Sequence, residues 1–166
     1  MRIILWLLAL TCLQTATAQI TVNSKNYGKL AFEELEYGQA RVVGRSEETN
    51  QKTPTGTRGW LQDFEIIAIT DSIRIASKAD FGVVYMIHAA DTVDIAVDLE
   101  WIYPQKIIND KGEAFKSIRY TTQRPTNIPS ASSYSLDEPY EMVKGPWKLN
   151  IYIENKKVFS RTFILY

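Results

Sequence analysis

The sequence has few of the residues on which covalent and metal chemistry usually depends. It contains one cysteine, Cys12, and one histidine, His88, among 166 residues. A single cysteine forms no disulfide within the chain, and a zinc site built around one histidine would need several carboxylates to complete it. No glycine-rich phosphate-binding motif is present either. We therefore expect no disulfide scaffold, no structural or catalytic metal site and no bound cofactor.

The sequence also lacks an excess of charge of either sign. It carries 19 basic and 19 acidic residues, and the formal net charge at pH 7 is zero. Proteins that bind nucleic acid or anionic lipid usually present a basic patch, and no cluster of lysine and arginine appears here. We therefore expect no nucleic-acid partner.

A long hydrophobic run is missing as well, and the one apolar block lies at the N-terminus. Arg2 precedes apolar residues from 3 to 13, and Ala16-Thr17-Ala18 supplies small side chains at the positions that a signal peptidase reads. The block is shorter than the roughly 20 residues that span a bilayer. Residues 1–18 are predicted to be a cleavable signal peptide, so we expect a periplasmic or secreted protein with no transmembrane segment after cleavage.

Residues 19–166 predict one all-β domain without disulfides, because Cys12 leaves with the signal peptide. Short blocks of β-branched and aromatic residues recur to the last residue, separated by turn residues at intervals of about ten. This pattern favours an immunoglobulin-like antiparallel β-sandwich of about seven to eight strands. A small outer-membrane β-barrel is the alternative, opposed by the segment 81–90, which is apolar on both faces of its strand.

The segment 93–101 alternates most regularly. Val93, Ile95, Val97, Leu99 and Trp101 share one face, which we expect to enter the core.

The opposite face of that strand carries the acidic residues Asp94, Asp98 and Glu100. Carboxylate oxygens suit calcium, so these residues are weak calcium candidates. Residues on one face of a strand stand about 7 Å apart, and Ala96 leaves a gap in the row. A solvated polar face is the favoured interpretation, and we assign no metal site to these residues.

Two segments look like loops. Residues 44–59 include no apolar side chain able to anchor them, which predicts a long polar loop that is mobile or folds on a partner. Residues 124–133 contain Pro125, Pro129 and several serine and threonine residues, which predict a second loop.

Several short motifs together resemble a known family. They are residues 80–85, residues 141–149 with Gly-Pro-Trp at 145–147, the closing segment 159–166, Glu36-Tyr37-Gly38, and Pro54-Thr55-Gly56. With these motifs the chain, from about Phe32 to its end, resembles the bacterial domain-of-unknown-function 3859 family. The resemblance implies an exported immunoglobulin-like domain. It implies no reaction and no catalytic residue.

Five residues are predicted to serve the structure rather than a ligand. Gly145 and Pro146 are expected at a strand entry, where the missing N–H of proline costs nothing. Trp147 is then expected to enter the core, with a sugar-stacking platform as its alternative role. Phe81 and Trp101 are expected in the same core.

No arrangement of residues forms an enzyme signature. His88 would have to serve any Ser-His-Asp triad, yet no serine sits in a strained Gly-x-Ser-x-Gly turn. We therefore expect no catalytic residues and a non-catalytic binding or assembly module of the bacterial envelope, which recognises a protein or glycan through a sheet edge or loops. The alternative is a hydrolase of envelope polymers that uses carboxylates from different strands.

Overall fold

The computed structural model describes residues 20–76 and 78–166, in which strands are the main element. The predicted signal peptide, residues 1–18, lies outside the described residues. In chain order the elements are β1 (Ile20–Ser24), β2 (Gly28–Thr49), β3 (Thr57–Ala68), β4 (Ser72–Ile73), β5 (Asp80–His88), β6 (Asp94–Ile108), β7 (Ala114–Pro125), β8 (Ser130–Ser135), the 3-10 turn η1 (Pro139–Glu141), β9 (Gly145–Ile153) and β10 (Lys156–Leu165).

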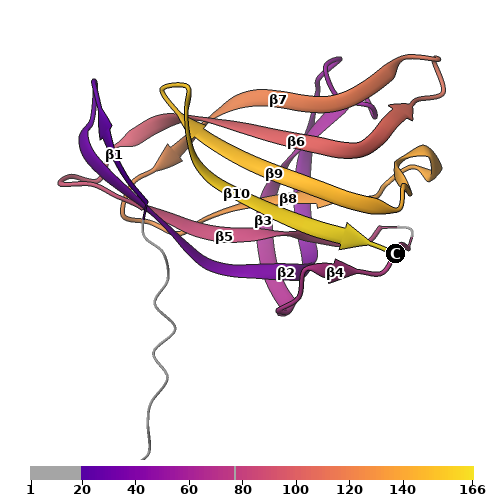
Figure 1. Ribbon diagram of the computed structural model, residues 1–166, viewed down its shortest axis with the longest axis horizontal. Coiled ribbons are helices and arrows are strands. Elements are labelled where there is room, and N and C mark those ends of the chain that lie inside the picture. The colour runs from indigo at the N-terminus through magenta and orange to yellow at the C-terminus, as the bar shows by residue number, and fades with distance from the viewer. Residues whose placement is uncertain (1–19, 77) are drawn as a thin grey trace, which may run out of the picture.

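These strands form two five-stranded sheets that pack face to face (Figure 1). The first sheet has the order β1-β2-β5-β8, with β3 paired to β2, and the second has the order β4-β10-β9-β6-β7. Neighbours pair antiparallel except β4 and β10, which run parallel. The predicted antiparallel β-sandwich is confirmed, with ten strands in the described residues because the short β1 and β4 add to the main set.

The alternation in β6 places one face of the strand in the core. Ile95, Val97, Leu99 and Trp101 are each at most 1% exposed. Val93, which was expected on this face, lies before the strand begins and is 43% exposed. The strand also continues past the proline at 104, in a stretch where its register with β7 is interrupted. The missing N–H of that proline therefore breaks no ladder bond.

Aromatic side chains from both sheets fill the centre of the core. Phe81 of β5 meets Trp101 of β6 and Trp147 of β9 edge to face, with ring centroids 5.6 and 5.9 Å apart. Trp147 is fully buried, and its indole N–H donates to the carbonyl of Val143 at 2.8 Å. Burial of the ring is therefore not opposed by an unpaired donor.

Gly145 and Pro146 begin β9, opposite the end of β10. Gly145 has φ +121°, and a Cβ atom there would lie 2.9 Å from the ring of Pro104. The position therefore requires glycine for its backbone conformation and for the close approach of β6.

The prediction of a long polar loop over residues 44–59 is wrong. Strand β2 runs to Thr49 and β3 starts at Thr57, so most of the segment is an antiparallel hairpin with a short turn. Backbone hydrogen bonds hold a hairpin whatever the polarity of its side chains, which is why the lack of apolar anchors misled the prediction. The second predicted loop, residues 124–133, is also shorter than expected, because β7 reaches Pro125 and β8 starts at Ser130.

We call the hairpin of residues 40–68 the arm. At Ala40, β2 leaves β5 and continues with β3 alone, and three register shifts bend the pair. Gly38 lies at the bend with φ +145°, where a Cβ atom would overlap the carbonyl oxygen of Ala68. In Figure 1 the arm rises from the first sheet to the level of β7 in the second.

No helix in residues 20–76 or 78–166 is long and apolar enough to cross a membrane.

Candidate functional site

The arm crosses one open side of the sandwich. On this side β8 is the outer strand of the first sheet and β7 is the outer strand of the second. The arm starts in the first sheet and reaches the second, so it spans the gap between these two edges (Figure 1). Any cavity between the two edges is therefore roofed by the arm.

Polar contacts attach the arm to the second sheet. The guanidinium of Arg58 lies 4.3 Å above the ring of Tyr120 and donates to the carbonyl of Thr121 at 3.4 Å. At the tip, the carbonyl of Pro54 accepts from the amide of Asn109 at 3.1 Å and from the hydroxyl of Tyr140 at 3.3 Å. The tip and one strand of the arm are thus both fixed.

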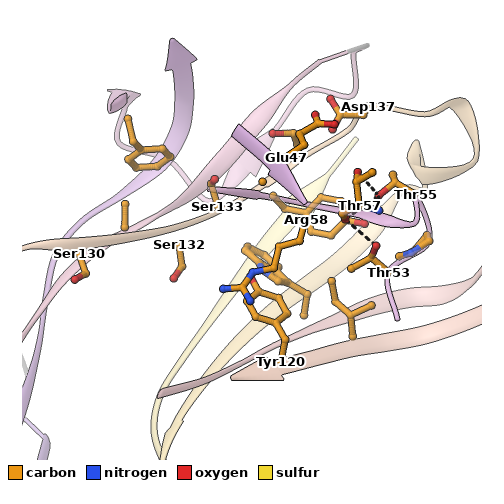
Figure 2. Close-up of a pocket in the computed structure, with 18 of the residues that line it drawn as sticks. Glu47, Thr53, Thr55, Thr57, Arg58, Tyr120, Ser130, Ser132, Ser133 and Asp137 are labelled. Carbon is orange, nitrogen blue, oxygen red and sulfur yellow. Dashed lines mark hydrogen bonds between the residues drawn. The ribbon is translucent and has the colours of Figure 1, made fainter. Parts of the chain in front are cut away.

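A pocket of about 400 Å³ lies beneath the arm. Its wall is formed by the arm, by β8, and by aromatic and aliphatic residues of β6 and β7, including Trp101, Ile118 and Tyr120. The pocket exists because β8 presents small serines where a core strand would present large apolar side chains. Ser130 and Ser132 point to one side of β8 and Ser133 to the other (Figure 2), so serines of both faces of the strand line the pocket.

Two buried polar atoms at the pocket wall have no hydrogen-bond partner. In the described part of the chain, Trp101 Nε1 and Ser132 Oγ are the buried side-chain polar atoms without one. Trp101 is 1% exposed and Ser132 is 3% exposed. Leaving such a group unpaired costs roughly 1–3 kcal/mol, so proteins usually satisfy it. Both atoms have less than 1 Å² of accessible surface, so they lie behind the pocket wall rather than on it.

The outer edge of β8 is short. In the described residues β5 is its partner strand, and the carbonyl of Ala131 on the other edge accepts from Arg124 at 3.3 Å. Because backbone groups alternate in direction along a strand, Ser133 and Ser135 direct their N–H and C=O groups to the same edge. That edge lies along the pocket, since both serines line it.

Carboxylates also line the pocket, and Glu141 is the most buried of them at 1% exposure. Burial raises the pKa of Glu141, and hydrogen bonds from the Tyr134 hydroxyl and from backbone N–H groups oppose this only in part. Its oxygens accept from Tyr134 at 2.6 Å and from the amides of Asp137 and Glu138 at 3.1 Å. Glu141 thus holds the η1 turn as part of a capping box.

The calcium candidates lie on the outward face of β6, away from this pocket. Asp98 accepts from Arg119 at 2.8 Å and from Thr121 at 2.7 Å. Glu100 accepts from two side chains of β9, an asparagine and a tyrosine, while Asp94 is exposed. In the described residues no three histidine, cysteine, aspartate or glutamate side chains are grouped to hold a metal ion.

His88 pairs with Glu33 of the neighbouring strand β2. The ring Nε2 and the carboxylate oxygen are 2.6 Å apart, and the two side chains are 37% and 30% exposed. The pocket lining does not include His88. The only histidine of the chain thus belongs to a half-buried pair on a sheet face.

The residues that build the pocket were not predicted from the sequence. Ser132, Tyr120 and Arg58 were not singled out, and Trp101 was considered only as a core residue. A signal for the hollow was present in the segment 130–135, where serines alternate along a strand that packs on a core. Two small polar residues on an inward face predict missing volume between two sheets.

The fold and the candidate site together define the class of protein to which the chain belongs. The chain is an immunoglobulin-like β-sandwich whose open side is roofed by a hairpin arm over a polar pocket. The family model for the domain of unknown function DUF3859 matches residues 28–165, and the chain belongs to that family.

The same fold is found in a solved structure. It is the crystal structure of an immunoglobulin-like protein from Pseudomonas aeruginosa, with a TM-score of 0.60 and 16% sequence identity over 91% of this chain and 99% of that chain. The comparison with curated proteins returns no match.

Proposed function

We propose that the chain is a non-catalytic binding module that acts outside the cytoplasm, in the periplasm or after secretion. Its binding site is the pocket beneath the arm together with the adjoining edge of β8, and its partner is a protein or glycan of the bacterial envelope. The observation that carries this proposal is the cavity of about 400 Å³ beneath the arm, whose lining combines hydroxyl side chains of the arm and β8 with Tyr120 and Ile118 of β7.

The distribution of polar partners favours binding over catalysis. A catalytic site needs a nucleophile or base within reach of a group that orients it. Here Glu141 is engaged by three hydrogen bonds that hold the η1 turn, and His88 lies outside the pocket. What the pocket offers a guest is hydrogen-bonding groups of the arm and β8 beside apolar and aromatic side chains of β7, and binding sites usually combine these two kinds of surface.

Photo-crosslinking at the mouth of the pocket tests the proposal. A photoreactive residue replaces Thr57, which is exposed and lines the pocket, in cells that express the chain at native level. We expect one defined adduct, which is lost when Ser132→Leu fills the pocket. The mass of the peptide that carries position 57 then shows whether the partner is a protein or a glycan.

The control places the same photoreactive residue at Lys157, which is exposed on β10. Identical adducts from positions 57 and 157, or an adduct that persists in Ser132→Leu, would contradict the pocket as the binding site. Recovery of unmodified protein alone from position 57 would contradict it as well.

A hydrolase of envelope polymers is the second candidate, because several carboxylates line the same pocket. They include Glu47 and Asp137, which lie together at one wall (Figure 2), and Glu141, whose pKa is raised by burial. A glycosidase needs two such groups on opposite sides of a sugar. Release of reducing ends from envelope polysaccharide by the native chain, and its loss in Asp137→Asn, would favour this candidate over simple binding.

A further inference from the structure

The arm does not take part in the hydrophobic core of the sandwich. Among the arm residues beyond Ala40 whose side chains the structure describes, none belongs to the core or to the partly buried apolar residues that pack against it. Two apolar side chains of the arm are exposed instead, Val43 at 66% and Ile67 at 49%. Burial of apolar surface is the main source of folding stability, so the core can stay closed while the arm moves.

Polar contacts hold the arm on the second sheet. Arg58 lies above the ring of Tyr120 and donates to the carbonyl of Thr121 at 3.4 Å. At the tip, the carbonyl of Pro54 accepts from the hydroxyl of Tyr140 at 3.3 Å. A neutral hydrogen bond or a cation–π contact of this kind shifts an equilibrium by roughly threefold to tenfold. The arm can therefore leave its docked position while the two sheets stay folded.

The base of the arm has the features of a hinge. Gly38 lies at the bend with φ +145°, and three register shifts interrupt the ladder between β2 and β3 in the residues that follow. On the other strand, residues 69–71 connect β3 to β4 outside any strand. Short segments at the ends of elements absorb the changes in backbone angle that let one part of a protein rotate against another. Bulged ladders bend at the same places.

The pocket beneath the arm is closed on one side by the arm itself. Its lining combines Thr57 and Arg58 of the arm with Tyr120 of β7 and Ser132 of β8 (Figure 2). Ser132 is 3% exposed with the arm docked. Binding sites of about this volume, 400 Å³, bury most of the surface of a ligand, so a movable wall allows the ligand to enter and then covers it.

From these features we infer that the arm is the lid of the pocket. It turns about the bend at Gly38 and the segment 69–71, and it releases the contacts of Arg58 and Pro54 with the second sheet together. The docked arm is the closed state, and the open state admits the ligand. This inference rests on the proposed function, since it names how the same binding site is opened.

Labelling of an introduced thiol tests the inference. Ser132→Cys places a thiol of similar size in the pocket lining, and N-ethylmaleimide should react with it only when the arm opens. Ser117→Cys, at an exposed position of β7, gives the rate of an unprotected thiol. Val158→Cys, at a fully buried position of β10, reacts only when the core opens. The mass of the peptide that carries each position reports the reaction, so that Cys12 does not contribute.

Two further substitutions loosen the lid at separate points. Arg58→Ala is expected to speed the labelling of Ser132→Cys about tenfold, because its contacts with the second sheet are lost. Tyr140→Phe is expected to speed it about threefold, the effect of one weak hydrogen bond at the tip. Tyr152→Phe is the control, because it removes a tyrosine hydroxyl on the outward face of the second sheet, and it should leave the rate unchanged.

Equal labelling rates with and without the two loosening substitutions would overturn the inference. So would a rate for Ser132→Cys, with the arm otherwise native, that equals the rate for Ser117→Cys. An equal acceleration of Val158→Cys would overturn it as well, because the whole domain rather than the arm would then open. If Ser132→Cys fails to fold, Ser130→Cys on the same wall takes its place.

The proposed function fails separately from the lid. A crosslink at position 57 that Ser132→Leu abolishes would keep the binding module even when labelling shows a fixed arm. A lid that opens without such a crosslink would contradict the proposed function and leave the movement of the arm.

Discussion

Asp98 is held by two neighbours on β7 whose hydrogen bonds oppose the cost of its partial burial. Burial alone would raise the pKa of this carboxyl, but the bonds from Thr121 and Arg119 outweigh it, and the pKa is lowered. The folded chain therefore favours the charged form. A residue that seemed a weak calcium candidate from sequence acts as an anchor between two strands of the second sheet.

Replacement of Asp98 tests this role through its pH dependence. A lowered folded pKa gives stability that is present above the unfolded pKa of about 3.9 and is lost as pH falls through the folded pKa. We expect Asp98→Asn to lower the free energy of unfolding by about 0.5–1 kcal/mol near neutral pH. The difference from the native chain should vanish in acid.

Urea denaturation across the acid range measures this difference, with Asp94→Asn as the control. Asp94 is an exposed carboxylate at the start of the same strand. A similar change in both variants at every pH would contradict the assignment. Addition of calcium chloride should leave the unfolding midpoint of the native chain unchanged, and a saturable rise that Asp98→Asn abolishes would restore the calcium interpretation.

Gly38 is the residue at which the arm turns away from the first sheet. Its φ of +145° is rarely adopted by other residues, and a Cβ atom would overlap the backbone carbonyl of Ala68 on β3. We expect Gly38→Ala to destabilise the chain by at least about 2 kcal/mol, since backbone has to move.

Gly112→Ala is the control for Gly38→Ala. Gly112 also has a positive φ, +80°, but open space surrounds its Cβ position. Its replacement should lower the free energy of unfolding by only about 1 kcal/mol, because only the positive-φ backbone conformation becomes less favourable. Equal losses in the midpoint of thermal unfolding would show that the contact with Ala68 is not what requires glycine at position 38.

At the scale of the element, the arm is the feature that distinguishes this sandwich from a plain pair of sheets. Beyond Ala40 its two strands pair with each other and, in the described residues, with no other strand, so its position over the pocket depends on contacts with the second sheet rather than on the ladder. Arg58 supplies two of them, on Tyr120 and on the carbonyl of Thr121.

Arg58→Ala is expected to loosen the arm while the core remains folded. Amide hydrogens of residues 40–68 should exchange about tenfold faster, the effect of losing roughly 1.4 kcal/mol of docking energy. Exchange in β5 and β6 should not change. Hydrogen exchange followed by mass spectrometry reports both regions in one experiment.

The matched control for Arg58→Ala is Arg41→Ala, which removes another arginine of the arm. Arg41 pairs with Glu65 within the arm, and the two side chains are 61% and 57% exposed. Such an exposed ion pair contributes little to stability, so amide hydrogen exchange in the arm should stay close to that of the native chain. Similar acceleration in both variants would mean that Arg58 does not dock the arm.

At the scale of the whole molecule, the chain relies on one core that joins both sheets. The core contains large side chains from β5, β6, β9 and β10, and it closes without any disulfide. Burial of this extent is sufficient for a domain of about 150 residues. Cleavage of the signal peptide, which contains Cys12, would therefore not lower the stability of the folded domain.

Export itself is tested on the whole protein. We expect the protein recovered from the periplasm or the culture medium to have the mass of residues 19–166, because the signal peptidase should cut after Ala18. Ala16→Leu, which places a large side chain in the motif read by the peptidase, should retain the full-length chain. A native chain that keeps residues 1–18 and stays in the cytoplasm would contradict export.

The sequence by itself determined the buried face of β6. Ile95, Val97, Leu99 and Trp101 alternate with polar residues, and since successive side chains of a strand point to opposite faces, the pattern fixes the buried face. The glycine, proline and tryptophan at 145–147 likewise reveal a strand entry from local chemistry alone. These features depend on neighbours in the chain, so they can be read without a structure.

Only the tertiary structure decided the arm and its pocket. The polar segment 44–59 gives no local sign that it forms a hairpin, and its tip is fixed by contacts such as that of Pro54 with Asn109, which lie 55 residues apart in the sequence. The pocket arises where small serines of β8 face Trp101 across the sandwich. Volume left between residues of different sheets depends on how those sheets pack, and local periodicity contains no record of that packing.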